Sequence, residues 1–442
     1  MLSNGVVPDK DGLAFETDPR KRVVVTGMGT ISPHGHSVAE FWEGVSRGKS
    51  AVGPITLCDA SPYPTRIAAE VKDWDPHKWI EARDARRMSR ATQFAVVSAR
   101  QALDDSRLEI TDAFSEEVGV LLGTGTSAFP EIEQGAQILF TKGGMRMNPF
   151  FTPIVLANMA TAQVSIHYGL RGYSSTVITA CAATTQAIGE AGEVIRRGDA
   201  TVMLAGGTEA AISGFGLAAF CLLRAMSRRN DDPQGACRPY SADRDGLVPG
   251  EGSAILVLER LDHALSRRAR IYAELIGYGC SSDAYHVVAP EPDARGAAKA
   301  ITRSLAGSGL APTDIDYINA HGTATDLNDP METRAVKLAF GDYAYELPLS
   351  SNKSMFGHLL GACGSLEAVS TIMSLRSGVM PPTINLEVPD PACDLDYVPN
   401  VPRQGDLRVV MKNNFGFGGH NASLIWRRWD AGDEAGLPDR GR

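Results

Sequence analysis

Several patterns that would assign a function at a glance are missing from this sequence of 442 residues. No two of its seven cysteines stand in C-x-x-C spacing and their number is odd, so neither a zinc site nor a disulfide framework is indicated. The H-E-x-x-H metal motif, the G-x-G-x-x-G dinucleotide turn and the G-x-S-x-G turn of serine hydrolases are also absent. We therefore expect no metal ion, and a reducing, cytoplasmic environment.

The sequence is also short of the features that mark secreted, membrane-bound or nucleic-acid-binding chains. Its first residues lack the apolar run of a signal peptide, and its net charge of −9 argues against nucleic acid as the main partner. The most apolar stretch, residues 200–223, is interrupted by Glu209 and several glycines. This favours a buried strand and a small-residue segment over a membrane span. We expect neither a membrane nor a nucleic acid as partner.

What the sequence does contain is an alternation of short apolar runs with segments of helical spacing. The runs lack a polar residue at every second position, which is typical of strands buried on both faces. Residues 185–197 carry Ile188, Ala191 and Ile195 at helical spacing. This alternation predicts an α/β fold. The eight expected strands are residues 22–26, 118–122, 176–179, 201–205, 254–258, 272–276, 315–319 and 409–412.

A weak internal echo predicts two similar halves. The segment around Cys181 has the order strand, turn and Ala/Gly-rich helix, and residues 347–378 repeat that order. No low-complexity linker separates the two segments. The expected organisation is a flexible arm over residues 1–20, a first half over 21–270, a second half over 271–427 and a flexible tail over 428–442.

The first motif with a chemical reading is TACAATT, which places Cys181 where a strand ends and a helix begins. A helix N-terminus lowers the pKa of a thiol toward the reactive thiolate, and its free amides form an oxyanion hole. Cys181 is therefore a candidate nucleophile. Taken alone, a single cysteine is more often a small buried hydrophobic residue.

Two further motifs carry histidines. NAHGTATD places His321 directly after an expected strand, on the kind of loop that holds catalytic groups to a rigid scaffold. SSNKSMFGHLLG holds Lys353 and His358 five residues apart, ahead of a helix that includes Glu367. A lone histidine is as often structural, and a lone lysine is usually a solvated surface charge. The neighbours of Lys353 are small or apolar, which is unusual for a surface loop.

The fourth motif, NFGFGGHN, sets three glycines around Phe415 and Phe417. A flexible turn with bulky side chains suits a gate over a binding site. The alternative is an ordinary glycine-rich hairpin.

Together these four motifs resemble those of the β-ketoacyl synthase family, in the branch with a Cys-His-His centre. The resemblance runs from about residue 22 to residue 427 and includes RVVVTGMGTISPHG at the start, LAGGTEA at 204–210 and RPYSADRDGLVPGEGSAILVLE at 238–259. It implies a thiolase-like fold of two αβ halves stacked in five αβαβα layers. It also implies an enzyme that condenses an acyl thioester with decarboxylating malonyl-acyl-carrier protein in fatty-acid elongation.

The resemblance implies a role for each matching residue. Cys181 takes the acyl group, His321 and His358 bind the malonyl thioester oxygen and stabilise the enolate, and Lys353 pairs with Glu367 to support His321. No resident cofactor is implied, because phosphopantetheine arrives on the carrier protein. The remaining family positions are the gate and oxyanion residues Phe417, Phe415 and Phe220, and the substrate-binding residues Thr323, Thr325 and Thr126.

The family carries basic residues for docking of its acidic carrier protein, and this chain has arginines at matching positions. A local basic patch would steer an acidic partner on an otherwise acidic protein. The alternative is that these arginines are simply solvated helix faces. They are Arg83, Arg86, Arg87 and Arg224.

Some features leave the pathway and the assembly open. Thr126 stands where the fatty-acid enzymes commonly carry isoleucine, so the acyl-chain preference is undetermined. The same chemistry also fits a type II polyketide or polyene ketosynthase. A homodimer is implied, with a heterodimer with a chain-length partner as the alternative. A non-condensing partner subunit fits less well, because such chains typically lack the nucleophile that Cys181 supplies.

Overall fold

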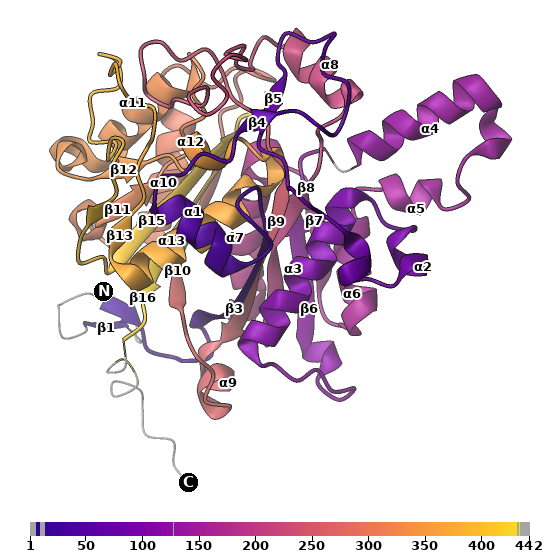
Figure 1. Ribbon diagram of the computed structural model, residues 1–442. Coiled ribbons are helices and arrows are strands. Elements are labelled where there is room, and N and C mark those ends of the chain that lie inside the picture. The colour runs from indigo at the N-terminus through magenta and orange to yellow at the C-terminus, as the bar shows by residue number, and fades with distance from the viewer. Residues whose placement is uncertain (1–5, 9–13, 127, 431–432, 434–442) are drawn as a thin grey trace.

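The computed structural model describes residues 6–8, 14–126, 128–430 and 433. At its centre a ten-stranded sheet consists of two sets of five strands that run in the same spatial order (Figure 1). In the first set the order is β3-β9-β8-β6-β7, and in the second it is β10-β16-β15-β11-β12. The first set comprises β3 (Val23–Ile31), β6 (Val118–Gly123), β7 (Ser174–Val177), β8 (Val202–Glu209) and β9 (Gly252–Arg260). The second comprises β10 (Ala273–Ser282), β11 (Tyr317–Asn319), β12 (Leu349–Ser350), β15 (Val409–Gly416) and β16 (His420–Arg428).

The two sets match in strand direction as well as in order. Each begins with two antiparallel pairings, β3 with β9 and β9 with β8, or β10 with β16 and β16 with β15. Each ends with two parallel pairings. Among the described strands, the two sets pair with each other where Ala273–Leu275 of β10 lies beside Val23–Val25 of β3. The molecule is therefore built of two halves of one design, as the internal echo predicted.

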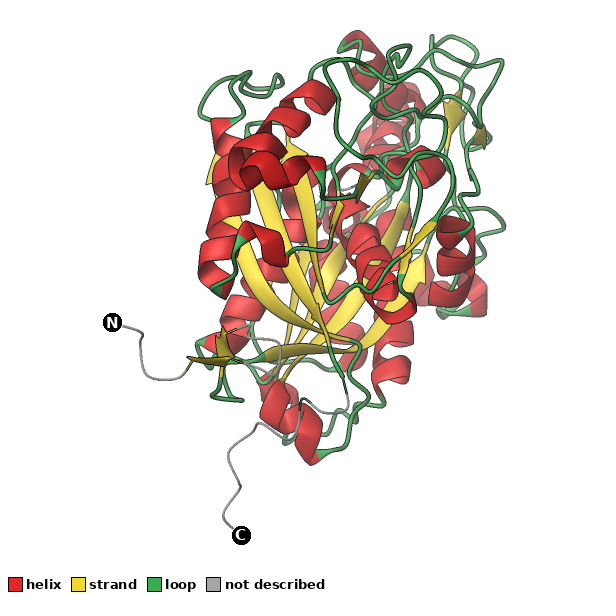
Figure 2. Ribbon diagram, turned by 90° about the vertical axis from the view of Figure 1, so that its left-hand side faces the viewer, coloured by secondary structure: helices red, strands yellow, loops and turns green. Residues whose placement is uncertain are grey.

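Helices cover the outer faces of the two sets of strands, which are called the first and the second sheet below, and fill the space between them (Figure 2). On the outer face of the first sheet, α3 (Arg90–Ser106) packs on β3 and β9, and α6 (Met159–Tyr168) packs on α3 and β6. Between the sheets, α7 (Ala183–Arg196) and α13 (Cys363–Ser377) pack on each other and contact strands of both sets. On the outer face of the second sheet lie α10 (Arg295–Ser308) and α11 (Asn328–Phe340). This is the predicted five-layer αβαβα fold.

The strands are buried on both faces because they lie between helices. Every residue of β3, β6 and β8 is buried. The eight runs expected from the sequence all contain a strand, although several strands extend beyond the expected run. β12 was expected only as the strand that opens the echo segment 347–378, and β16 was not predicted.

The two middle helices begin with the same strained turn. One 3-10 turn (Ala180–Ala182) leads into α7, and another (Leu360–Ala362) leads into α13. The first residue of each turn, Ala180 or Leu360, has a positive φ of 49° or 47°. Such a backbone is costly for residues other than glycine and is found mainly at functional sites. The equivalent of Cys181 in the second half is Gly361.

Most of the remaining elements lie toward the edges and the ends of the molecule, whereas α12 is wholly buried. Helix α4 stands out from the body at the right of Figure 1. The helices are α1 (Val38–Ser46), α2 (Ala82–Ala85), α4 (Phe129–Lys142), α5 (Phe151–Val155), α8 (Gly214–Leu222), α9 (Leu261–Ser266) and α12 (Lys353–Phe356). The short strands are β1 (Val6–Pro8), β2 (Ala14–Glu16), β4 (Gly53–Pro54), β5 (Ile67–Ala68), β13 (Val379–Met380) and β14 (Arg403–Gln404).

The predicted terminal segments are described only in part. Within the arm expected over residues 1–20, β1 pairs with β2 in antiparallel register. Residues 1–5 and 9–13 of that arm lie outside the described residues, as does most of the tail expected over 428–442. The boundary expected at residue 270 falls just before β10 and stays a prediction. Within the described residues, no helix is both long and apolar enough to cross a membrane.

Candidate active site

A cavity of about 430 Å³ lies where the two halves meet. The first half contributes Cys181 to its lining, and the second contributes His321 and His358. The gate and substrate residues expected from the sequence also line the cavity, as does one of the expected docking arginines. These lining residues are Thr126, Phe220, Arg224, Thr323, Thr325, Phe415 and Phe417.

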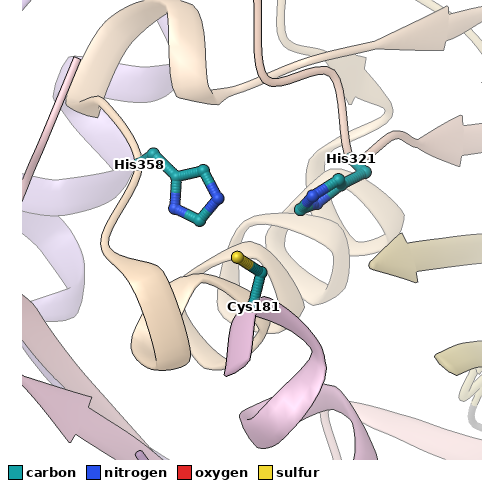
Figure 3. Close-up of side chains that lie close together, drawn as sticks. All are labelled: Cys181, His321 and His358. Atoms are coloured by element: carbon teal, nitrogen blue, oxygen red, sulfur yellow. The ribbon is translucent and has the colours of Figure 1, made fainter. Parts of the chain in front are cut away.

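Cys181, His321 and His358 point toward one another from three separate segments (Figure 3). Cys181 lies in the strained turn that begins α7, His321 follows β11, and His358 lies between α12 and the turn that begins α13. The thiol sulfur and one ring nitrogen of each histidine lie within 4.8 Å of one another. The three groups are almost wholly buried. They can therefore act together on one small reacting group.

His321 is held in a single tautomer by its surroundings. Its Nδ1 accepts a hydrogen bond from the Asn414 side-chain amide at 2.9 Å and lies 3.3 Å from the Lys353 ammonium. Because both partners are donors, Nδ1 carries no proton, and the proton of the neutral ring is on Nε2. Burial first, and then the charge of Lys353, hold the pKa of His321 well below its usual value. His321 is thus a neutral hydrogen-bond donor.

His358 reaches the same state through other contacts. Its Nδ1 accepts a hydrogen bond from the Leu360 backbone N–H at 2.9 Å and lies 3.3 Å from the Cys363 sulfur. Burial and the charge of Lys353 hold its pKa well below the usual value. The two rings lie 5.6 Å apart, nearly perpendicular to each other. Each ring presents an Nε2–H, and two such donors suit an oxygen on which negative charge develops.

The same geometry argues against a metal ion at these three residues. Thiol and imidazole groups are common metal ligands, and the atoms are close enough to share one ion. A metal would need the lone pair of each Nε2. Both Nδ1 atoms already face hydrogen-bond donors, so the proton cannot move there. The arrangement therefore suits hydrogen-bond donation.

The pKa of the Cys181 thiol differs from the expected one. Burial raises its pKa to about 11, against the opposing effects of the Lys353 charge and of the backbone amides of Phe417 and Cys181. The predicted lowering of the pKa is thus wrong for the free protein, because removal of water outweighs the helix end. The two amides lie close to the sulfur. They can stabilise charge on sulfur, and then on a carbonyl oxygen, during attack on a thioester.

The NFGFGGHN motif forms the hairpin between β15 and β16, and this hairpin packs against the turn that holds Cys181. A Cβ atom added to Gly416 would lie 3.1 Å from the Cys181 nitrogen. Phe415 lies edge-on to His321, with ring centres 5.8 Å apart. Phe417, between the strands, lines the cavity. The motif is therefore both a hairpin and part of the wall beside the nucleophile.

Beneath the histidines lies a buried group of charges that the sequence analysis found only in part. Lys353 forms the expected ion pair with Glu367 and also donates to the His321 carbonyl oxygen at 2.6 Å. Lys412, which we did not single out, binds the other oxygen of Glu367 at 2.6 Å. Two lysines therefore share one carboxylate, and all three side chains are fully buried.

The two lysines respond differently to this sharing. Burial works against the charge of Lys353, but Glu367, Cys363 and Glu332 outweigh it and raise the pKa of Lys353. Burial and the charge of Lys353 outweigh Glu367 at Lys412 and lower its pKa to about 8. The sequence signal that could have revealed Lys412 is its place inside the apolar run VVMKNNFG.

A buried glutamate missed in the sequence analysis organises the first half of the cavity wall. Glu209, at the end of β8, accepts hydrogen bonds from the amides of Gly125 and Gly361 at 2.6 and 3.0 Å. It also accepts a bond from the Thr126 hydroxyl at 2.6 Å. The Thr126 hydroxyl is thus bound to protein and does not point into the cavity as a free polar group.

The expected docking arginines do not all lie in the same surroundings. Arg83 and Arg86 are exposed on and beside α2. Arg87 is partly buried, and its guanidinium lies 4.3 Å from the ring centre of Phe150. Arg224 is exposed and lines the cavity. Only Arg224 is thus placed to act on a substrate at the cavity itself.

Comparison with known proteins places this cavity in a family. Residues 20–264 match the N-terminal domain of β-ketoacyl synthases, and residues 272–387 match their C-terminal domain. The matches cover most of the chain, so it belongs to the β-ketoacyl synthase family, whose members are condensing enzymes of the acyltransferase class.

Individual relatives cover nearly the whole chain. The chain is 48% identical to 3-oxoacyl-[acyl-carrier-protein] synthase 2 of Synechocystis sp. over 93% of its own length and 99% of the relative. A β-ketoacyl synthase structure from Burkholderia phymatum shows 38% identity and a TM-score of 0.86, covering 92% of this chain and all of that one. The ishigamide ketosynthase/chain length factor shows 36% identity and a TM-score of 0.87, covering 92% and 99%.

Proposed function

We propose that this chain is a 3-oxoacyl-[acyl-carrier-protein] synthase II that extends acyl chains by decarboxylative condensation in fatty-acid synthesis. The observation that carries the proposal is the pair of neutral histidines, each presenting an Nε2–H beside the thiol of Cys181. The synthase 2 name of the Synechocystis relative supports the pathway.

In the first step the sulfur of Cys181 attacks the carbonyl carbon of an acyl thioester. The C–S bond to the carrier breaks, and the proton of Cys181 ends on the released carrier thiol. The amides of Cys181 and Phe417 hold the oxygen that becomes negative during the attack. The product is an acyl group covalently bound to Cys181.

In the second step a malonyl thioester binds with its carbonyl oxygen against the two Nε2–H groups of His321 and His358. Its carboxylate leaves as CO₂, and the electron pair of the broken C–C bond forms an enolate. Donors that meet charge only as it develops lower the barrier of this step. The enolate carbon attacks the acyl group and expels the Cys181 thiolate, which takes up a proton. The reaction needs no resident metal or cofactor, because phosphopantetheine arrives with each substrate.

This chemistry requires acyl-carrier protein as a partner. We propose a second synthase chain as a further partner. Phe140 in α4 is 84% exposed and Met145 beside it is 99% exposed. The strand β7, at the edge of the sheet, carries no partner on its outer side within the described chain. Exposed apolar groups and a free strand edge are typical of surfaces covered by another chain. We propose a homodimer; the expected cytoplasmic location stays a prediction.

A type II polyketide ketosynthase is the second candidate. It is favoured by the similarity to the ishigamide ketosynthase/chain length factor, whose name pairs a ketosynthase with a chain length factor. The apolar surface at α4 would then be covered by a partner chain of a different sequence. Both candidates use the same residues for the same condensation.

The test of the condensing function is the acyl-enzyme intermediate. The wild-type chain incubated with acyl-carrier protein loaded with a saturated acyl group should gain the mass of one acyl group, and Cys181→Ala should gain none. Cys280→Ala, which removes a partly buried thiol on β10, is the matched control and should be acylated as the wild type is. Equal acylation of the wild type and Cys181→Ala contradicts the proposal.

A further inference from the structure

The second half of the molecule contains a series of buried side chains that are linked by hydrogen bonds and end at His321. On β15, Lys412 and Asn414 are two residues apart and therefore lie on the same side of the strand. The Lys412 ammonium donates to Oδ1 of Asn414 at 2.6 Å, and Nδ2 of Asn414 donates to Nδ1 of His321 at 2.9 Å. None of the three side chains is open to water.

The orientation of the Asn414 amide follows from its partners. An ammonium group has only donors, so the Asn414 atom that meets Lys412 is the carbonyl oxygen. The Thr185 hydroxyl donates to the same oxygen. The amide nitrogen must then face the other side, where it meets His321 and an oxygen of Glu367 at 3.1 Å. The amide cannot turn over without placing its nitrogen against the ammonium.

The two histidines of the site are therefore fixed by different kinds of group. The tautomer of His358 is set by the backbone N–H of Leu360, which no substitution other than proline removes. The tautomer of His321 is set by side chains. Lys353 also lies near its Nδ1, at 3.3 Å, but makes a shorter bond to the carbonyl oxygen of His321 and an ion pair with Glu367.

We infer that Asn414, oriented by Lys412, is a positioning residue that keeps the proton of His321 on Nε2, where it binds the malonyl thioester oxygen. The inference rests on the proposed function and concerns the decarboxylation step alone. Asn414 forms no part of the cavity lining among the described residues. Its effect on acyl transfer to Cys181 is accordingly small.

Asn414→Asp is the decisive variant, because it has nearly the same shape and inverts the hydrogen bond. One oxygen of the introduced carboxylate keeps the bond to Lys412, and the other faces Nδ1 of His321. It can bond there only if Nδ1 carries a proton, and a neutral ring then has no proton on Nε2. Loss of one oxyanion donor costs roughly 100-fold in rate. Decarboxylation of malonyl-acyl-carrier protein should fall about that far at pH 7.5, while acylation of Cys181 stays within about threefold.

The pH profile separates a tautomer effect from general damage. The introduced carboxylate is faced by the ammonium of Lys412, the ring of His321 and the carboxylate of Glu367. When it is protonated it can donate to Nδ1, so decarboxylation by Asn414→Asp should recover as the pH is lowered. Asn414→Leu removes the donor without imposing the other tautomer. It should lose roughly five- to tenfold, the worth of one hydrogen bond, with no recovery at low pH.

Asn413→Leu is the matched control. Asn413 is the adjacent residue of β15, is equally buried, and its side chain makes no hydrogen bond within the described part of the protein. Both reactions should stay within about threefold of wild type in this variant. Thermal unfolding of all four proteins shows whether each variant is folded.

Two outcomes contradict the inference. One is decarboxylation by folded Asn414→Asp within threefold of wild type. The other is an equal loss of acylation and decarboxylation, with no recovery at low pH. If the wild-type chain itself is not acylated and does not decarboxylate malonyl-acyl-carrier protein, the proposed function fails instead.

Discussion

Thr126 is one of the residues that line the cavity. It is smaller than the isoleucine commonly found there in the fatty-acid enzymes, and its hydroxyl is turned to Glu209. The space beside it is therefore apolar, and about one methylene wider. A difference of that size discriminates chains by roughly 1–3 kcal/mol.

We expect Thr126→Ile to shorten the longest acyl chain that the enzyme accepts. The introduced side chain fills the extra space and also removes the hydroxyl from buried Glu209. The measurement is kcat/KM across a series of acyl-carrier substrates of increasing length. Thr126→Val, which removes the hydroxyl but hardly changes the size, is the control. A length profile shared by Thr126→Ile and the wild type would show that this residue does not set the pocket.

Lys412 predicts an unusual dependence of stability on pH. Burial and the charge of Lys353 lower its pKa to about 8, below the usual lysine value of 10.5. Between these two pH values the unfolded chain binds the proton more strongly, so the free energy of unfolding gains from this group as the pH rises. The gain is on the order of 3 kcal/mol.

Lys412→Met should remove this contribution. The difference in unfolding free energy between wild type and variant, measured by denaturant titration, should move in favour of the wild type from pH 8 toward pH 10. Glu367, Lys353 and Cys363 face the same ammonium, so the curves of the two proteins are compared rather than read singly. A difference that does not change over this range contradicts the depressed pKa.

At the level of residues, the sequence predicted the groups that recur in motifs and missed those that only support them. Cys181, His321 and His358 follow expected strands, and the structure brings all three together. Asn414 and Glu209 were missed because an asparagine beside glycines and a glutamate in an apolar stretch have many structural explanations. The pKa of Cys181 could not be predicted, because burial depends on the packing of both halves.

At the level of elements, the docking surface should be carried by α2 and by the turn after α8. Arg86 beside α2 and Arg224 after α8 are exposed, and a basic surface attracts an acidic carrier protein. The double variant Arg86→Glu and Arg224→Glu should raise KM for carrier-bound acyl groups about tenfold and change kcat little. Small thioester analogues should be affected less.

Arg100→Glu gives the control for charge alone. Arg100 is exposed on α3, and α3 contributes no residue to the cavity. This variant should leave both KM values unchanged. Equal losses on carrier-bound and small substrates in the double variant would point to misfolding or to a different role for these arginines.

The elements themselves were predictable where the strands are long and buried. Residues 22–26 and 201–205 were recognised because apolar runs between helices allow little else. β12 has only two residues, and the internal echo was the one sign of it. β16 starts directly after the glycines of NFGFGGHN, a motif that we expected to form a gate, with a hairpin as the alternative, and we named no strand after it.

For the molecule as a whole, the apolar surface at α4 predicts a dimer. Phe140 and Met145 lie almost free of contacts within one chain. In sedimentation experiments the wild-type chain alone should show twice its monomer mass, and Phe140→Glu with Met145→Glu should shift it toward the monomer. Leu338→Glu changes an exposed leucine on α11, on the opposite outer layer, and should remain dimeric. A monomeric wild type would favour a requirement for a different partner chain.

The two strained turns, at the starts of α7 and α13, occupy equivalent places in the two halves. Two halves with one strand order and the same kind of turn offer two equivalent places for a nucleophile. The second place is closed. A Cβ atom added at Gly361 would lie 2.1 Å from the Gly125 nitrogen, so no cysteine fits there. In the proposed reaction the acyl group is therefore bound to the first half, and the malonyl group is activated by the histidines of the second.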